Sequence, residues 1–310
     1  MDFLPLCRNR MTKKSRNWLM VLLLLPAAVI LAIVGLSIFN ATRPLPPVRP
    51  LPNPNGYDAL VKAGEMAAIE TGDFSETKLE DLRAQTAKNY GALQAARIGL
   101  QEDCAVPLQF SLNVSQHLPE LADFKRLAQA FVVEGQRAEM ENRPGDAVKS
   151  YLDTIRLGHK SAQGGVLIDQ LVGTAIEAMG VSHLQKLVDQ LDAKTCRETA
   201  ATLETLDAQR QTWTEVMQQE RAWVRRAYPD IKYRWSELVV SSSLKKGIQK
   251  AEQKFKNQQS KTRQLLVDLA ARAYQLDHGR RPASVADLTP DYLRAVPKDP
   301  FSDTNLVLTP

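Results

Sequence analysis

The chain has 310 residues, with 40 Lys and Arg against 35 Asp and Glu and a formal net charge of +5. Part of this charge lies in residues 1–17, so the rest of the chain is close to balanced, which argues against a nucleic-acid-binding surface. Aromatic residues make up only 6%, and Ala, Leu, Gln, Glu, Lys and Arg dominate, a mixture that favours helices.

Residues 18–39 form an uncharged apolar stretch that predicts a transmembrane helix. At about 1.5 Å of rise per residue it spans about 33 Å, enough for a hydrocarbon core of about 30 Å. Basic side chains are concentrated in residues 1–17, which predicts a cytoplasmic N-terminal tail. A cleaved signal peptide is the alternative, but the apolar run is too long and Phe39 stands where such a cut needs a small residue. We therefore predict a single-pass signal-anchor in the bacterial inner (cytoplasmic) membrane.

Residues 40–54 are rich in proline and predict a semi-rigid linker. Residues 55–278 predict an antiparallel helical domain outside the cytoplasm, so the expected fold class is all-α, and residues 279–310 predict a short Pro-rich C-terminal tail. Apolar spacing and turn residues predict helices over about 57–71, 76–100, 164–191 and 192–228. Two further helices are expected within residues 119–161, separated at Pro144-Gly145, and an amphipathic helix is expected over residues 245–263, with another helix that ends at Gly279. The helix over 164–191 is the most apolar of these and is expected to lie at the centre of the core.

Two small residues, Gly135 and Ala138, precede a break at Pro144-Gly145, and Ala147 and Tyr151 follow it. From about residue 128 to residue 161, the chain resembles a single tetratricopeptide (TPR) unit. In that family small residues allow two antiparallel helices to approach closely, and the aromatic ring fills the gap to the next pair. No second copy follows, so the resemblance implies one TPR-like hairpin within a larger all-α domain.

The C-terminal region carries a second motif. Its residues are Ala273, Tyr274, Leu276, Asp277, Gly279, Arg280, Pro282, Leu288, Tyr292, Leu293 and the run 297–301. Over residues of about 273–310 this pattern resembles the C-terminal segment of type II secretion major pseudopilins. The N-terminal apolar run lacks the Glu that pseudopilins carry, and no metal ligand is carried over. The layout of anchor, Pro-rich linker, helical domain and tail also resembles uncharacterised single-span bacterial membrane proteins.

The tail is expected to pack onto the helical domain, because a free tail would leave many apolar side chains in water. These side chains are Val285, Leu288, Tyr292, Leu293, Val296, Phe301, Leu306 and Val307.

A lysine-rich stretch begins at Lys245 and also contains Lys246, Lys250 and Lys254. Apolar residues at positions 248, 251 and 255 indicate that it is one face of an amphipathic helix. One interpretation is contact with anionic lipid headgroups or an acidic partner, and the other is an ordinary solvated helix face.

No chemical motif stands out. None of the four histidines has a partner at metal-ligand spacing, and the phosphate-binding, dinucleotide-binding and hydrolase motifs are absent from the sequence. Cys104 and Cys196 are predicted to lie outside the cytoplasm, where they form either a disulfide or two buried free thiols. We therefore predict no catalytic, cofactor-binding or metal-binding residue, no cofactor and no enzymatic activity.

These observations favour a membrane-anchored protein that acts as an interaction or envelope scaffold, with other envelope proteins as partners. A component of a secretion or pilus-like assembly is the first alternative, and an enzyme of unknown type is the second. An open apolar groove would favour binding, whereas several titratable groups with shifted pKa values in one pocket would favour catalysis.

Overall fold

The computed structural model describes residues 50–69, 78–110, 117–227 and 242–308, together with Gly35 and Val48. The predicted tail of residues 1–17 and the predicted span of residues 18–39 lie outside the described residues, apart from Gly35. Within the described ranges, no helix combines the length and the apolarity that a membrane crossing requires. Residues Arg49–Pro310 form one compact unit, and the following description concerns this unit alone.

The described part of this unit is helical, which confirms the all-α prediction. The α-helices are α2 (Gly56–Met66), α3 (Leu79–Lys88), α4 (Tyr90–Gln101), α5 (Leu118–Met140), α6 (Pro144–Ala162), α7 (Leu167–Leu187), α8 (Ala193–Ala208), α9 (Trp213–Ala227) and α11 (Ser242–His278). Short 3-10 helices cover Val188–Gln190 and Val285–Leu288.

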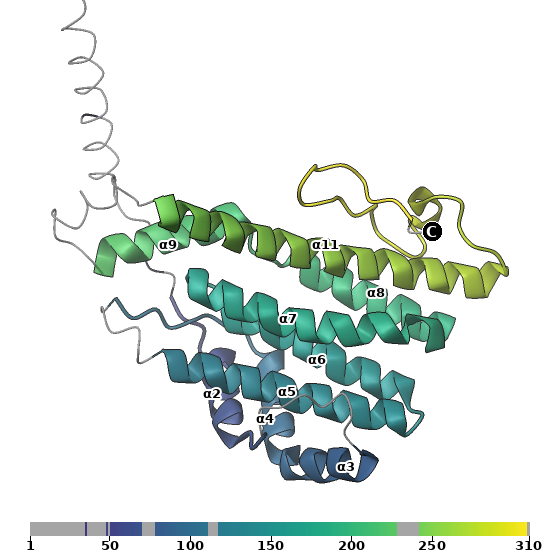
Figure 1. Cartoon of the computed structure of the whole chain (residues 1–310), viewed down its shortest axis with the longest axis horizontal. Helices are drawn as coiled ribbons and strands as arrows, with labels where there is room; N and C mark the ends of the chain where they lie inside the picture. Colours follow the sequence, from purple (N-terminus) through teal and green to yellow (C-terminus); the bar gives the residue numbers. More distant parts are fainter. Residues whose placement is uncertain are drawn as a thin grey trace, which may run out of the picture. The chain divides into compact units, whose positions relative to one another are not determined.

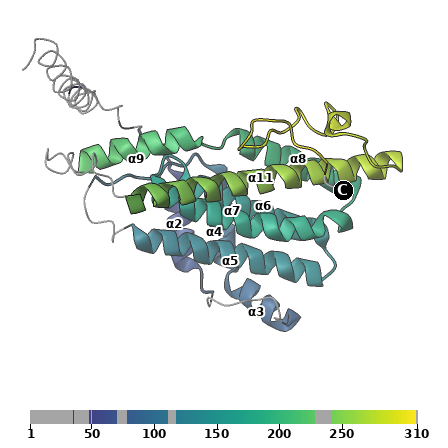
Figure 2. The ribbon, with the colours of Figure 1, turned by 45° about the horizontal axis from the view of Figure 1, so that its top comes forward.

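Two buried hydrophobic clusters hold these helices together. One joins α2, α3 and α4 to α5 and to parts of α6 and α7, and the other joins α5, α6, α7, α8, α11 and the C-terminal tail. Figures 1 and 2 show α11 running beside α7 and α8, with α3 on the opposite side of the unit. The central layer is therefore α5, α6 and α7, and the most apolar predicted helix lies within it.

The prediction of one helix over 76–100 is wrong, because Asn89 separates α3 from α4. The Asn89 side chain is buried, donates to the Gln85 carbonyl at 2.8 Å and accepts from the Ala68 amide at 2.8 Å. Its amide group thus competes with the helical backbone for hydrogen bonds. Tyr90, the first residue of α4, is exposed.

The predicted helix over 192–228 is also divided, between α8 and α9. Thr212 starts the second helix with a reciprocal cap. Its hydroxyl accepts from the Glu215 amide at 3.2 Å, and the Glu215 carboxylate accepts from the Thr212 amide at 2.7 Å. This capping box is present in the sequence as Thr-Trp-Thr-Glu, a pattern that predicts the start of a new helix.

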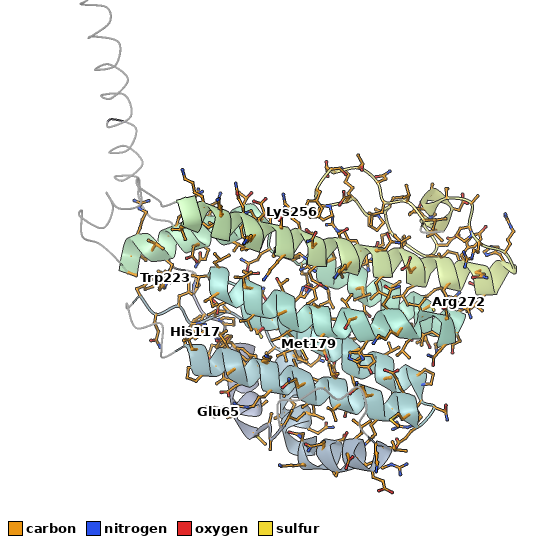
Figure 3. All side chains as sticks on the ribbon, viewed as in Figure 1. Glu65, His117, Met179, Trp223, Lys256 and Arg272 are labelled. Atoms are coloured by element: carbon orange, nitrogen blue, oxygen red, sulfur yellow. The ribbon has the colours of Figure 1, made fainter. Side chains whose placement is uncertain are left out.

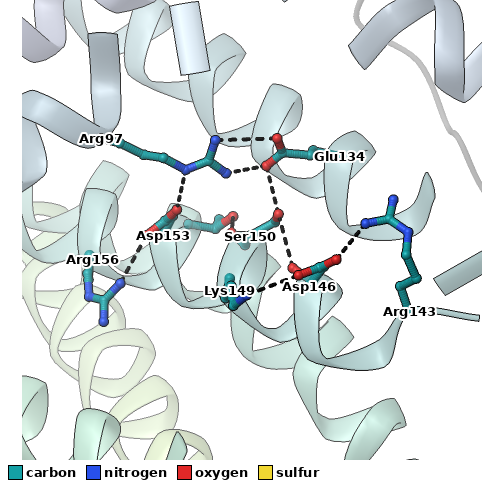
Figure 4. Close-up of polar contacts among 9 residues, drawn as sticks. Arg97, Glu134, Arg143, Asp146, Lys149, Ser150, Asp153 and Arg156 are labelled. Carbon is teal, nitrogen blue, oxygen red and sulfur yellow. Dashed lines mark hydrogen bonds and ion pairs between the residues drawn. The ribbon is translucent and has the colours of Figure 1, made fainter. Parts of the chain in front are cut away.

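Helices α4, α5 and α6 are joined by a polar network around Arg97 (Figure 4). The Arg97 guanidinium pairs with Glu134 of α5, and its Nε donates to Asp153 of α6 at 2.9 Å. Ser150 Oγ donates to the same Glu134 carboxylate at 2.7 Å. The network fixes the α5–α6 hairpin against α4. Within the hairpin, Tyr151 of α6 packs directly against Gly135 of α5.

The C-terminal tail packs onto the second cluster, as its apolar residues predicted. Val285, Leu288 and Leu293 are buried there. Two of the expected contacts are not made, because Phe301 and Val307 are exposed. The end of the tail folds back as a small hairpin that an antiparallel bridge between Lys298 and Asn305 closes.

Candidate functional site

A cavity of about 330 Å³ opens at the start of α7. Its walls are mainly apolar and come from the segment after α4, the first turns of α5 and α7, and α9. The lining residues are Val106, Pro107, Leu108, Gln109, His117, Glu120, Val166, Leu167, Ile168, Asp169, Leu171, Glu220 and Trp223. Figure 3 shows His117 and Trp223 at the same end of the helical unit. The cavity is large enough for several apolar side chains or a small molecule.

The start of α7 is built by a glycine pair. Gly164 has a φ of +73°, a conformation that other residues rarely adopt, and a Cβ on Gly165 would lie 2.6 Å from the Asp169 side chain. The Asp169 carboxylate can therefore reach back and accept from the Val166 amide at 2.7 Å. Carboxylates are favoured at this end of a helix because the first amides have no intrahelical partner.

His117 is clamped between two carboxylates at the edge of this cavity. Its Nε2 lies 2.5 Å from Asp169 Oδ1, and its Nδ1 lies 2.8 Å from Glu120 Oε2. The hydrogen bond to Asp169, followed by that carboxylate's charge and by Glu120, raises the pKa of His117 against the opposing effect of burial. The imidazole thus favours its charged form, in which both nitrogens donate, and it has no free nitrogen to accept a proton.

Tyr57 of α2 extends the network. Its hydroxyl donates to Glu120 at 2.8 Å, and its ring stacks on His117 with the ring centres 6.5 Å apart. Burial, together with the Glu120 carboxylate, raises the pKa of Tyr57, so the hydroxyl remains protonated. The network therefore ties α2 and the first turn of α5 to the start of α7.

Glu220 of α9 forms the other polar wall. Its carboxylate accepts from the amide of Leu167, the first residue of α7, at 2.8 Å. Burial raises the pKa of Glu220, and the charge of Asp169 adds to the rise, while the amide contact opposes it. Trp223, one turn later, donates to the Gln109 carbonyl at 2.9 Å and holds the facing segment in place.

Among the described residues that line the cavity, the charged groups are three carboxylates and one histidine, with no Lys or Arg. A charged His117 offsets one carboxylate, so the cavity favours a ligand that brings hydrogen-bond donors or positive charge. The apolar wall, formed by Leu108, Ile168 and Leu171, favours a ligand with an apolar body. These two requirements together describe an amphipathic ligand with a cationic group.

A second, smaller cavity of about 50 Å³ adjoins Glu177 of α7. Arg210 and His159 lie against this buried carboxylate, and the Thr262 hydroxyl donates to it at 2.5 Å. Burial opposes ionisation of Glu177, but the Arg210 charge outweighs it and lowers the pKa. This cavity holds a few water molecules at most, and its side chains connect α6, α7, α8 and α11.

The structure does not bring together the two cysteines that the sequence offered as a disulfide pair. Cys104 and Cys196 are both buried and unpaired, in different hydrophobic clusters, so the free-thiol alternative holds and the disulfide alternative is wrong. Burial raises the pKa of each thiol to about 11, which leaves neither as a ready nucleophile. Among the described residues, no group of three His, Cys, Asp or Glu side chains is placed to hold a metal ion.

Sequence reasoning named no site residue and missed His117, Glu120, Asp169 and Glu220. The spacing of His117 and Glu120, three residues apart at a helix start, was a weak signal for part of the site. Asp169 follows a glycine pair by four residues, which is typical of a helix cap. Nothing in the sequence connects Glu220 with the other three, because only the fold brings α9 to the start of α7.

Comparison of the chain with protein-family models, with curated proteins and with solved structures gives no match. The function is therefore inferred from the chemistry of the cavity.

Proposed function

We propose that this protein is a membrane-anchored binding protein of the bacterial envelope. Residues 18–39 would anchor it in the inner membrane, and the helical unit would lie outside the cytoplasm. The cavity at the start of α7 would receive an apolar segment of a partner protein that carries a basic residue. The observation that supports this function is the open apolar cavity with carboxylates at its polar wall.

The apolar wall explains why the occupant is an apolar segment. Ile168 lies in the first turn of α7, yet it is 36% exposed, and Leu171 is only partly buried. Burying two large apolar side chains contributes about 3–6 kcal/mol, at about 1.5–3 kcal/mol each. Occupation of the cavity therefore removes from water the surface that α7 leaves exposed.

The polar wall explains why the segment is basic. Glu120 and Glu220 are partly exposed at the cavity, whereas the Asp169 side chain is fully buried and already bonded to His117 and a backbone amide. A Lys or Arg next to the apolar side chains can donate to Glu120 or Glu220 without breaking either of those bonds. Charge-assisted hydrogen bonds of this kind contribute about 1.5–3 kcal/mol.

Membrane anchoring would make such a small site effective. Association costs about 4–15 kcal/mol in lost translational and rotational freedom, which is comparable with what the cavity supplies. Confinement of both partners to one membrane reduces that cost through a high effective concentration. The TPR-like α5–α6 hairpin is consistent with a protein-binding role, and the pseudopilin-like tail favours partners from a secretion or pilus-like assembly.

An enzyme of unknown type is the second candidate, and Glu220 is the feature that favours it. A carboxyl group whose pKa is raised by burial in an apolar cavity is suited to act as a general acid. Such a reaction also needs a free base or nucleophile, and the hydrogen bonds of His117 and Asp169 already occupy the groups that could serve.

Photochemical cross-linking in living cells tests the binding function, because it captures contacts that are too weak to survive extraction. Ile168 is replaced by benzoylphenylalanine, and Ile98, which is 67% exposed on α4 outside the cavity, is replaced in the same way as the control. We expect protein adducts from position 168 and none from position 98. The cross-linked peptide, identified by mass spectrometry, should combine apolar residues with a Lys or Arg.

Three outcomes would contradict the proposal. The first is a cross-linked peptide without a basic residue, and the second is no adduct from position 168. The third is an adduct with a small molecule in place of a peptide, which would support the enzyme candidate.

A further inference from the structure

The first half of α11 carries a basic surface, defined here as Lys245, Lys246, Lys250 and Lys254. All four side chains are exposed. Ala251 and Phe255, on the other face of the same helix, are buried, and the Phe255 ring lies 5.8 Å from that of Trp213. The helix is thus held by its apolar face, and its lysines are presented outward.

No acidic side chain of the described residues forms an ion pair with this basic surface. Glu252, the one acidic residue between positions 244 and 256, pairs with Lys256 at 2.8 Å. The exposed residues between the lysines are neutral, at positions 247, 249 and 253. Elsewhere on the unit, exposed lysines such as Lys149 and Lys194 lie next to carboxylates. The basic surface therefore has a local excess of positive charge.

The outward surface of this half of α11 is formed by the lysines themselves. Leu244 and Ile248, although 55% exposed and partly exposed, lie on the same helix face as Ala251 and Phe255. A group of lysines on one face of a helix is attracted to anionic lipid headgroups. Neither of the two cavities described above is lined by any of the four lysines.

We propose that this basic surface docks on anionic lipid headgroups of a bilayer. Each lysine near such a bilayer increases the affinity about fivefold, and the attraction decays over a Debye length of about 10 Å at 0.1 M salt. Lysine suits this role because its charge is a point on a flexible stem, whereas shaped recognition of single phosphates favours arginine. The proposal is independent of the cavity and of the partner proposed for it.

The test uses the full chain reconstituted in nanodiscs of phosphatidylcholine, with or without phosphatidylglycerol. A fluorophore is attached to Leu244→Cys in a Cys7→Ser background, in which the buried Cys104 and Cys196 do not react. A spin-labelled lipid quenches the fluorophore when α11 lies on the bilayer. We expect at least threefold stronger quenching with phosphatidylglycerol, and its loss in 1 M salt. A fluorophore on Ile98→Cys of α4 should respond to neither change.

The lysines are then replaced. The fourfold variant with Gln at positions 245, 246, 250 and 254 should lose the response to phosphatidylglycerol. Its matched control replaces four other exposed lysines, Lys62, Lys78, Lys88 and Lys186, by Gln and should keep the response. Equal quenching in both lipids, a response that survives the fourfold variant, or failure of the chain to enter either nanodisc would overturn the proposal. Release of the fluorophore from the bilayer by polyglutamate at low salt would instead identify an acidic protein as the stronger partner, and would also overturn it.

Discussion

At the scale of single residues, the His117 clamp connects the stability of the protein with the site. The groups that face its ring are Tyr57, Glu120 and Asp169. The two carboxylates lie on opposite sides of the ring and would repel each other without it. The charged imidazole thus stabilises the arrangement that places both carboxylates at the cavity.

His117→Phe keeps the ring and removes both hydrogen-bond donors. We expect the free energy of unfolding to fall by about 1.5–3 kcal/mol at pH 6, because Asp169 and Glu120 each lose a charged partner. Thermal unfolding in detergent, followed by tryptophan fluorescence, measures the change. His278→Phe is the matched control, because His278 is exposed and rests on the Tyr274 ring, and a loss of similar size there would contradict the account.

The effect of His117→Phe should depend on pH. The folded protein holds the pKa of His117 above its ordinary value of 6.5, so the stabilisation is complete below pH 6.5 and is lost as the pH rises through the folded-state pKa. His183 acts in the opposite direction, because burial lowers its pKa. The informative quantity is therefore the difference in Tm between the wild type and His117→Phe. We expect this difference to be largest below about pH 6.5 and to shrink as the pH rises above it, and a constant difference would show that His117 is neutral in the fold.

At the scale of elements, the contact between α6 and α7 depends on glycines. A Cβ on Gly173 would lie 2.4 Å from the Gly158 carbonyl oxygen, closer than any side chain can approach. Gly173→Ala must therefore push the two helices apart, and we expect it to lower the free energy of unfolding by at least about 1–3 kcal/mol.

Gly247→Ala of α11 is the matched control for Gly173→Ala. Nothing lies within 4 Å of the Cβ it would add, so the same change inside an exposed helix should raise the free energy of unfolding by about 0.5–1 kcal/mol. Urea unfolding of the two variants measures both changes. A Gly173→Ala variant as stable as the wild type would contradict the close approach of α6 and α7 at this glycine.

The helices themselves were predictable where the apolar spacing was strong, as in α5, α6, α7 and α11. The breaks between helices were less predictable from the sequence. Asn89 divides α3 from α4 through a contact with Ala68, 21 residues away, which no local pattern contains. The break before α9 was readable from the capping box at Thr212 and was overlooked because apolar residues continue at helical spacing on both sides.

At the scale of the whole molecule, the C-terminal tail is part of the core. Leu288 is fully buried in the cluster that contains α6, α7, α8 and α11. Leu288→Ala should lower the free energy of unfolding by about 2–5 kcal/mol, because it leaves a cavity there. Leu276→Ala, at a residue that is 42% exposed on α11, should change it by no more than about 0.5 kcal/mol. Equal effects in thermal unfolding would indicate that the tail does not pack.

The cavity could not be predicted because its walls come from segments that are far apart in the chain. The sequence marked α7 as a core helix, and most of α7 is, but its first turns face an opening between α5, α9 and the segment after α4. An apolar residue such as Ile168 has the same appearance in the sequence whether it faces a core or a cavity. The packing of whole helices decides between the two.

The central claim is that carboxylates at the cavity select a basic, apolar segment. The most direct test is the yield of the protein adduct from benzoylphenylalanine at position 168 when Glu120 and Glu220 are both replaced by Gln. Gln keeps an oxygen for the Leu167 amide and the Tyr57 hydroxyl but removes the charge that pairs with His117, so thermal unfolding of the double variant checks that the fold is retained. We predict that the yield falls about tenfold, because each charge-assisted hydrogen bond contributes at least about 1.4 kcal/mol. The control replaces the exposed Glu65 and Glu198 by Gln and should leave the yield unchanged. An equal yield in the two double variants would contradict the claim.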